Sequence, residues 1–87
     1  MTQIKVPAAL TGGSSAAIVE VDGASVGEAL EAHADAHGPE LRDSVIEDGG
    51  IREYINVFVN GEPIEHGVDT PVGPEDVIRI VPAASGG

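Results

Sequence analysis

The sequence predicts a two-layer α+β domain in which a mixed sheet of four to five strands packs on one main helix. Three observations support this fold class: short runs of alternating apolar and polar residues in both halves of the chain, one segment with helical periodicity between them, and an Asn-Gly hairpin signal. A chain of 87 residues has room for one domain with a modest core. A sheet with a single long helix must bury one face under that helix, which gives two layers.

The first two strands are expected in the N-terminal part of the chain. In "QIKVP", Ile4 and Val6 face the core, Lys5 faces solvent, and the proline ends the strand. The run "AIVEVD" alternates in the same way, with Val19 and Val21 on one face and Ile18, Glu20 and Asp22 on the other. These runs predict an antiparallel hairpin with a long connection.

The main helix has clear start and stop signals. "SVGE" matches a capping box, in which the Ser25 side chain bonds the amide of Glu28 and Glu28 reaches back, so the helix should begin at Val26. Gly38 and Pro39 end it. Helical periodicity places one set of residues on the buried face: Val26, Ala29, Leu30, His33, Ala36 and His37. The acidic residues Glu28, Glu31 and Asp35 lie on the opposite side, in solvent.

The second half of the chain predicts a short helix, a hairpin and a last strand. "PELRDSVI" adds a turn of helix, with Leu41, Val45 and Ile46 facing the core, before "EDGG" breaks the chain. In "EYINVFVNGEPIE", alternating residues lead to the Asn60-Gly61 turn and a short returning strand. The proline of that returning strand, Pro63, places it at a sheet edge.

The last strand, "DVIRIVP", completes the element order β-β-α-β-β-β, which is that of the β-grasp fold. Ile78 and Ile80 point inward. The first and last strands should lie side by side and parallel in the centre, because a helical crossover connects them. We therefore expect a domain over residues 1–82 and a flexible C-terminal tail, 83–87, that leaves from a central strand.

One outward surface is a candidate docking site. Tyr54, Asn56 and Phe58 share the outer face of their strand, and Arg79 and Val81 extend that face on the last strand, beside Val77. Phe58 and Val81 are apolar where solvent is expected. An apolar patch rimmed by polar groups indicates a docking surface, with scattered surface residues as the alternative explanation.

Nothing in the sequence indicates an active site or a bound cofactor. The chain has no cysteine, which excludes disulfides, thiolate metal sites and cysteine nucleophiles. His33 and His37 have the four-residue spacing of metal ligands, but they continue the apolar helix face without an acidic residue or an evident third ligand. We predict core or core-edge histidines and no metal. None of the serines lies in a nucleophile motif.

Charge and hydropathy limit the partners. The net charge of −11 comes from 15 acidic residues against Lys5, Arg42, Arg52 and Arg79, so nucleic acids and anionic membranes are poor partners. The acidity suits a basic protein partner, or only keeps the protein soluble, as in a salt-rich cytoplasm. No apolar run approaches a membrane span, and "MTQIKVPAAL" does not resemble a signal peptide, so a cytoplasmic location is expected.

The whole pattern resembles the ubiquitin-like sulfur carrier proteins of the ThiS/MoaD family. The resemblance rests on "YINVFVNGEPI", "GPEDVIRIVP" and the terminal "SGG". Asp76, Val77, Pro82, Gly86 and Gly87 match the family's final motif, whereas alanines replace the second proline and the valine of its tail. The long first loop, with "PAALTGG", is more similar to the carriers that feed cysteine synthesis than to those for thiamin.

The resemblance implies a chemistry for Gly87. An ATP-dependent, E1-like enzyme would adenylate its carboxylate, and a sulfur donor would convert the acyl-adenylate to a thiocarboxylate that donates sulfur in the synthesis of cysteine, molybdopterin, thiamin or another thiolated metabolite. Gly86 and Gly87 suit such a tail because glycine lacks a Cβ and can thread a narrow channel. The expected partners are the activating enzyme and a downstream synthase. They would dock on Phe58, Arg79, Val81 and Pro82.

Three other functions remain open from the sequence. The same activated Gly87 could be joined to lysines of target proteins, which would make the chain a protein modifier. A β-grasp binding module with an inert tail is the second alternative, and a stand-alone enzyme is the third. As a carrier, the protein is a co-substrate with no catalysis of its own, and we expect a monomer when it is free.

Overall fold

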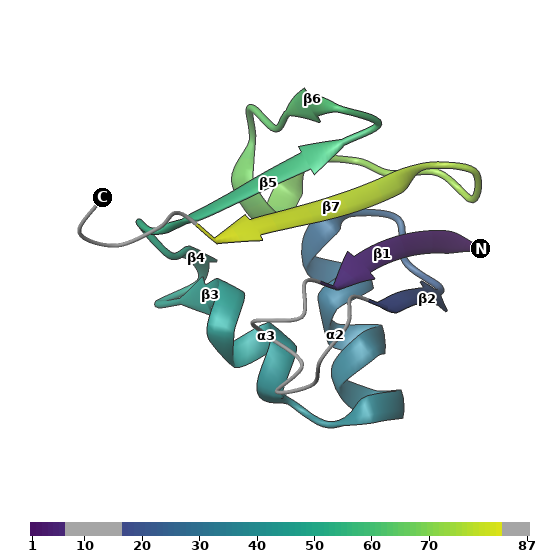
Figure 1. The fold of residues 1–87 in the computed structure, drawn as a ribbon, viewed down its shortest axis with the longest axis horizontal. Helices are drawn as coiled ribbons and strands as arrows, with labels where there is room; N and C mark the ends of the chain where they lie inside the picture. Colours follow the sequence, from purple (N-terminus) through teal and green to yellow (C-terminus); the bar gives the residue numbers. More distant parts are fainter. Residues whose placement is uncertain (7–16, 83–87) are drawn as a thin grey trace.

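Five strands form one mixed sheet in the computed structural model, which describes residues 1–6 and 17–82 (Figure 1). The strand order is β2-β1-β7-β5-β6. The strands are β1 (Thr2–Val6), β2 (Ala17–Val21), β5 (Ile55–Val59), β6 (Glu62–Pro63) and β7 (Val77–Pro82). The predicted α+β class and the β-grasp order are confirmed.

The first and last strands lie side by side at the centre of the sheet. β1 and β7 are parallel, with Gln3 opposite Val77 and Ile4 opposite Ile78, and their arrows point the same way in Figure 1. β1–β2, β5–β7 and β5–β6 are antiparallel pairs. The predicted central position of the last strand is therefore confirmed.

Two helices cover one face of the sheet: α2 (Val26–His37) and α3 (Glu40–Val45) (Figure 1). The helix α2 begins where the capping box predicts, because the amide of Glu28 donates to Oγ of Ser25 at 3.2 Å. The Glu28 carboxylate reaches back one residue further than expected, accepting at 3.2 Å from the amide of Ala24. Gly38 ends the helix with a φ of 97°.

The inner face of the sheet and the two helices enclose one apolar core. It consists of Ile4, Val6, Val21, Val26, Ala29, Leu30, Leu41, Val45, Val57, Val72, Ile78 and Ile80. β1 and β7 supply the inward residues predicted for them, β2 and β5 contribute Val21 and Val57, and Ile46 packs against the core as expected. The predicted helix face is wrong at its C-terminal end, where Ala36 and His37 are exposed. The last turn of α2 extends past the core, so periodicity alone does not bury it.

A small second hairpin interrupts the expected loop. β3 (Ile46–Glu47) pairs with β4 (Gly50–Ile51) across a turn in which Asp48 and Gly49 have φ values of 53° and 79°. Two central residues with positive φ make the tight turn that Asp-Gly favours. At "EDGG" we predict only a break from the sequence, although its Asp-Gly pair is itself a hairpin signal.

The Asn60-Gly61 turn forms as predicted. Asn60 and Gly61 have φ values of 54° and 85°, and Phe58 pairs with Pro63 across the hairpin. Pro63 lies on the edge strand, where a missing amide costs no sheet hydrogen bond. The 3-10 helix η1 (Gly67–Asp69) then leads back beside α2 and on to β7.

Within the two described ranges, no helix has the length and apolar character needed to cross a membrane.

Candidate functional site

A row of five side-chain positions crosses the outer face of the sheet, opposite the helices. The register pairs Ile18 with Lys5, Lys5 with Arg79, Arg79 with Phe58, and Phe58 with Pro63. One residue from each strand therefore contributes to the same line, which we call the outer row. Neighbouring positions in such a row are close enough for their side chains to interact.

Three of the four predicted docking residues come together on this face. Phe58 and Arg79 are direct cross-strand partners, and Val81 follows Arg79 on the same side of β7. Arg79 is exposed, whereas Phe58 and Val81 are half-buried. Pro82 pairs with Ile55, and the alternation of β7 assigns it to the inner side. The structure thus separates Pro82 from the other three.

The outer row also contains residues that the sequence prediction did not include among the docking residues. Ile18 is 61% exposed on β2, and Lys5 is exposed on β1. Their outward orientation follows from strand alternation, but their position beside Arg79 and Phe58 depends on strand order and register. The predicted parallel pairing of the first and last strands is therefore the observation from which these neighbours of Arg79 could be identified.

A hydrogen-bond clamp joins the β5–β6 turn to the start of β7. The Asn60 amide group donates to Asp76 at 2.8 Å, and its oxygen accepts from the amide of Val77 at 2.9 Å. Asp76 also accepts from the amide of Gly73 at 2.8 Å, and the Thr2 hydroxyl donates to the Gly73 carbonyl at 2.8 Å. The Gly73 amide, and then the Asn60 side chain, lower the pKa of Asp76 because they stabilise its carboxylate. The two sequence motifs "VNG" and "EDV" are thus one structural unit.

The helical histidines occupy different environments. His33 is buried, while His37 is exposed, and their ring centroids are 4.9 Å apart. Burial, and then the neighbouring His37, lower the pKa of His33. In the described residues no group of three or more His, Asp or Glu side chains is placed to hold a metal.

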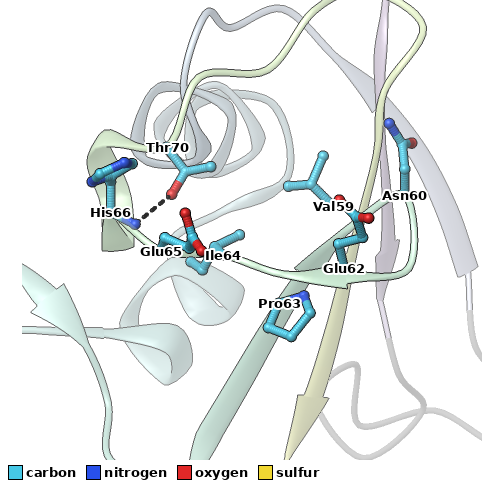
Figure 2. A pocket seen from close by; sticks show the side chains of 8 residues that line it. All are labelled: Val59, Asn60, Glu62, Pro63, Ile64, Glu65, His66 and Thr70. Atoms are coloured by element: carbon cyan, nitrogen blue, oxygen red, sulfur yellow. Dashed lines mark hydrogen bonds between the residues drawn. The ribbon is translucent and has the colours of Figure 1, made fainter.

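An open groove lies between the β5–β6 hairpin and η1 (Figure 2). Its rim includes Glu62, Glu65 and His66, whose backbone amide donates to Oγ1 of Thr70 at 3.3 Å. Ile64 and Val59 are among its apolar lining residues. The groove shares Pro63 with the outer row, and its acidic residues give it a negative charge.

The predicted reaction site, Gly86 and Gly87, lies outside the described residues, and so does the predicted tail boundary at residue 83. The described chain reaches Pro82, at the end of the central strand β7. The roles of Gly86 and Gly87 stay predictions.

Comparison with known proteins identifies the family. The profile of the ThiS family matches residues 4–87. The chain belongs to the ThiS family. The members similar to this chain are small carrier and modifier proteins with a ubiquitin-like fold, rather than catalysts.

Three matches to this ThiS-family chain cover most of both proteins. Small archaeal modifier protein 1 of Haloferax volcanii is 43% identical over 77 residues, which are 86% of this chain and 85% of that protein. The crystal structure of the Amycolatopsis orientalis BexX/CysO complex contains a chain with a TM-score of 0.84 and 27% identity, with both chains fully covered. The crystal structure of SAMP1 from Haloferax volcanii has a TM-score of 0.72 and 34% identity over 99% of this chain and 98% of that one.

Proposed function

We propose that this ThiS-family protein is a sulfur carrier whose Gly87 carboxylate is adenylated by an E1-like enzyme and then converted to a thiocarboxylate. The observation that carries the proposal is the family match, which extends through residues 86 and 87. The likeness to a chain of the BexX/CysO complex supports a protein that works bound to an enzyme. We propose the cytoplasm, where ATP is available, as its location.

The chemistry needs only a carboxylate and an accessible tail from this chain. The Gly87 carboxylate attacks the α-phosphate of ATP, pyrophosphate leaves, and an acyl-adenylate forms. A hydrosulfide equivalent from a sulfur donor then attacks the acyl carbon, and AMP leaves with its electron pair. The chain has no cysteine, so the transferred sulfur can reside only on the terminal carbonyl carbon.

The strand β7 connects the proposed docking face to the proposed tail. β7 contributes Arg79 and Val81 to the outer face, and the proposed tail, 83–87, follows directly after this strand. A partner that contacts Phe58, Arg79 and Val81 is therefore near the start of the tail. We propose that the activating enzyme and a downstream sulfur-accepting synthase use this surface in turn. Pro82 would mark the boundary between the domain and the tail.

A second candidate function is protein modification. The 43% identity to Small archaeal modifier protein 1 favours it, because that relative is named as a modifier. The activation step is the same, and the adenylated Gly87 would then be attacked by a lysine amine of a target instead of a sulfur nucleophile. Lys5 is the only lysine in the chain, so self-conjugation through a lysine would have to use the docking face.

The test uses the full chain and the E1-like adenylating enzyme from the same host. Wild-type protein should support ATP–pyrophosphate exchange, and protein purified from the host should show the mass increase of an oxygen-to-sulfur exchange at the C-terminus. Deleting Gly87, or replacing Gly86 with Val, should abolish exchange, because the tail must fit a narrow site. The thermal unfolding of both variants should match that of the wild type.

Normal exchange with the chain lacking Gly87 would exclude both activated functions and leave a binding module. If the enzyme activates the chain but no thiocarboxylate is detected, and conjugates to host proteins are present, protein modification would be favoured over sulfur transfer.

A further inference from the structure

The four cationic side chains of this acidic protein are divided between its two faces. Arg42 pairs with Glu31 and with Asp43, both at 3.2 Å. Arg52 pairs with Glu47 at 2.7 Å. These pairs lie on and beside α3. Lys5 and Arg79 are adjacent to each other in the outer row instead, and among residues 1–6 and 17–82 neither forms an ion pair.

The centre of the outer face lacks the acidic residues found elsewhere. On β7 the outward positions are Val77, Arg79 and Val81, and on β5 they are Asn56 and Phe58. Carboxylates occur at the periphery of this face. Glu20 is on edge strand β2, opposite Gln3. Asp76, at the start of β7, has both oxygens engaged in the clamp. The middle of the sheet is thus locally positive on a chain of net charge −11.

Two cations directly opposite each other in a sheet destabilise the free protein slightly. Exposure to water keeps this cost small. The same two cations can share one carboxylate when a partner covers them, and burial then strengthens the attraction. Ile18 and Phe58 flank the pair in the row and offer apolar contact on either side.

We infer that the partner docking on the outer face places a carboxylate between Lys5 and Arg79, with apolar side chains over Phe58 and Ile18. This inference rests on the proposed function, since the occupant is the adenylating enzyme. It specifies an acidic docking patch on that enzyme, although the acidity of the chain as a whole suggests a basic partner. Any basic partner surface would face the helices, where the carboxylates are.

The experiment measures binding of the full chain to the E1-like adenylating enzyme of its host, and the KM and kcat of ATP–pyrophosphate exchange. The double variant Lys5→Gln/Arg79→Gln should weaken binding and raise KM roughly tenfold, the scale of two charge pairs, with little change in kcat. Glu20→Lys adds a cation at the periphery of the same face and should tighten binding, most clearly at low salt.

The matched control is Arg42→Gln/Arg52→Gln, which removes the same charge from the helix side and should leave binding unchanged. Equal weakening in the two double variants would show that only net charge matters and would overturn the inference. An unchanged KM for Lys5→Gln/Arg79→Gln, with exchange still dependent on Gly87, would overturn it and leave the proposed function standing. Absence of exchange with the wild type would instead remove the proposed function and this inference together. Thermal unfolding monitors folding, and Arg79→Gln alone replaces the double variant if that variant is unstable.

Discussion

At the level of single residues, the burial of His33 disfavours the protonated, charged form of its side chain. Its side chain lies in the buried face of α2, and its Nδ1 atom has no hydrogen-bond partner in the part of the chain that the structure describes. A protonated imidazole there would lose water contacts and lie 4.9 Å from the His37 ring, centroid to centroid. The folded protein therefore disfavours the charged form of this residue.

The pH dependence of stability follows from this shift. The pKa of His33 lies below 6.5 in the folded state, so the unfolded chain binds more protons as the pH falls below 6.5. This contribution is fully present above that value and is lost at lower pH. The free energy of unfolding, measured by denaturant titration, should fall between about pH 7 and pH 5, and His33→Leu should flatten that decline. The control His66→Gln changes an exposed histidine and should retain it. An identical pH dependence in the wild type and in His33→Leu would contradict the assignment.

The clamp between the β5–β6 turn and β7 operates at the level of elements. It joins three segments: a hairpin turn, the loop before β7, and the N-terminal strand through Thr2. Asn60 has two roles in it, because its backbone adopts the positive φ of the turn and its side chain holds the start of β7. The clamp thus fixes where the central strand begins.

Asn60→Gly separates these two roles, because glycine accepts the backbone conformation and lacks the side chain. Loss of the Asn60–Val77 hydrogen bond alone should lower the free energy of unfolding by about 1 kcal/mol, and the lost contact to Asp76 adds to this. Asn60→Asp keeps the acceptor for the Val77 amide but places a second carboxylate beside Asp76. The free energy of unfolding is measured by chemical denaturation for both variants, for Asp76→Ala and for the double variant Asn60→Gly/Asp76→Ala. The double variant gives the coupling between the Asn60 and Asp76 side chains. Simple additivity of the effects would show that the clamp is not a unit.

Most elements could be predicted because their signals are local. The capping residue Ser25, the Asn60-Gly61 pair and the alternation through Ile78 and Ile80 each depend on a few neighbours in sequence. Errors occurred where the outcome depends on distant packing. The exposure of His37 depends on how far the core extends under α2, and periodicity contains no such information.

The residues of the candidate site also fall into two groups: those that local sequence patterns predict and those that depend on the pairing of distant strands. Strand alternation placed Phe58, Arg79 and Val81 outward, as the structure has them. Lys5 and Arg79 are adjacent in the outer row because of the register between β1 and β7. The alternation within a single strand does not determine that register. The family resemblance places Pro82 among the docking residues, whereas its register partner is the inward Ile55.

At the level of the whole molecule, the dominant electrostatic property is the excess of 15 acidic over 4 basic residues. The ion pairs of Arg42 and Arg52 are exposed, and pairs of this kind contribute little to stability. The remaining carboxylates repel each other, and this repulsion favours the more expanded, unfolded chain.

Added salt should therefore stabilise the protein. The midpoint of thermal unfolding should rise as NaCl increases from low to about physiological ionic strength, where the Debye length is about 8 Å, and then change less. KCl should act equally if charge screening is the cause. Arg42→Gln/Arg52→Gln removes two cations and should steepen the dependence. A midpoint that falls with salt would mean that the exposed ion pairs outweigh the general repulsion.

The parallel pairing of β1 with β7 also has a consequence for biosynthesis. When β1, β2 and both helices have left the ribosome, the strand that must occupy the middle of the sheet has not yet emerged. Until then β1 and β5 expose open edges toward each other, and closing the sheet requires contacts between distant parts of the sequence, which slow folding. A chain that stops short of β7 lacks part of the proposed docking face and the residues that follow this strand. If the chain is activated at Gly87, as we propose, this topology would restrict activation to polypeptides that have been made to the end.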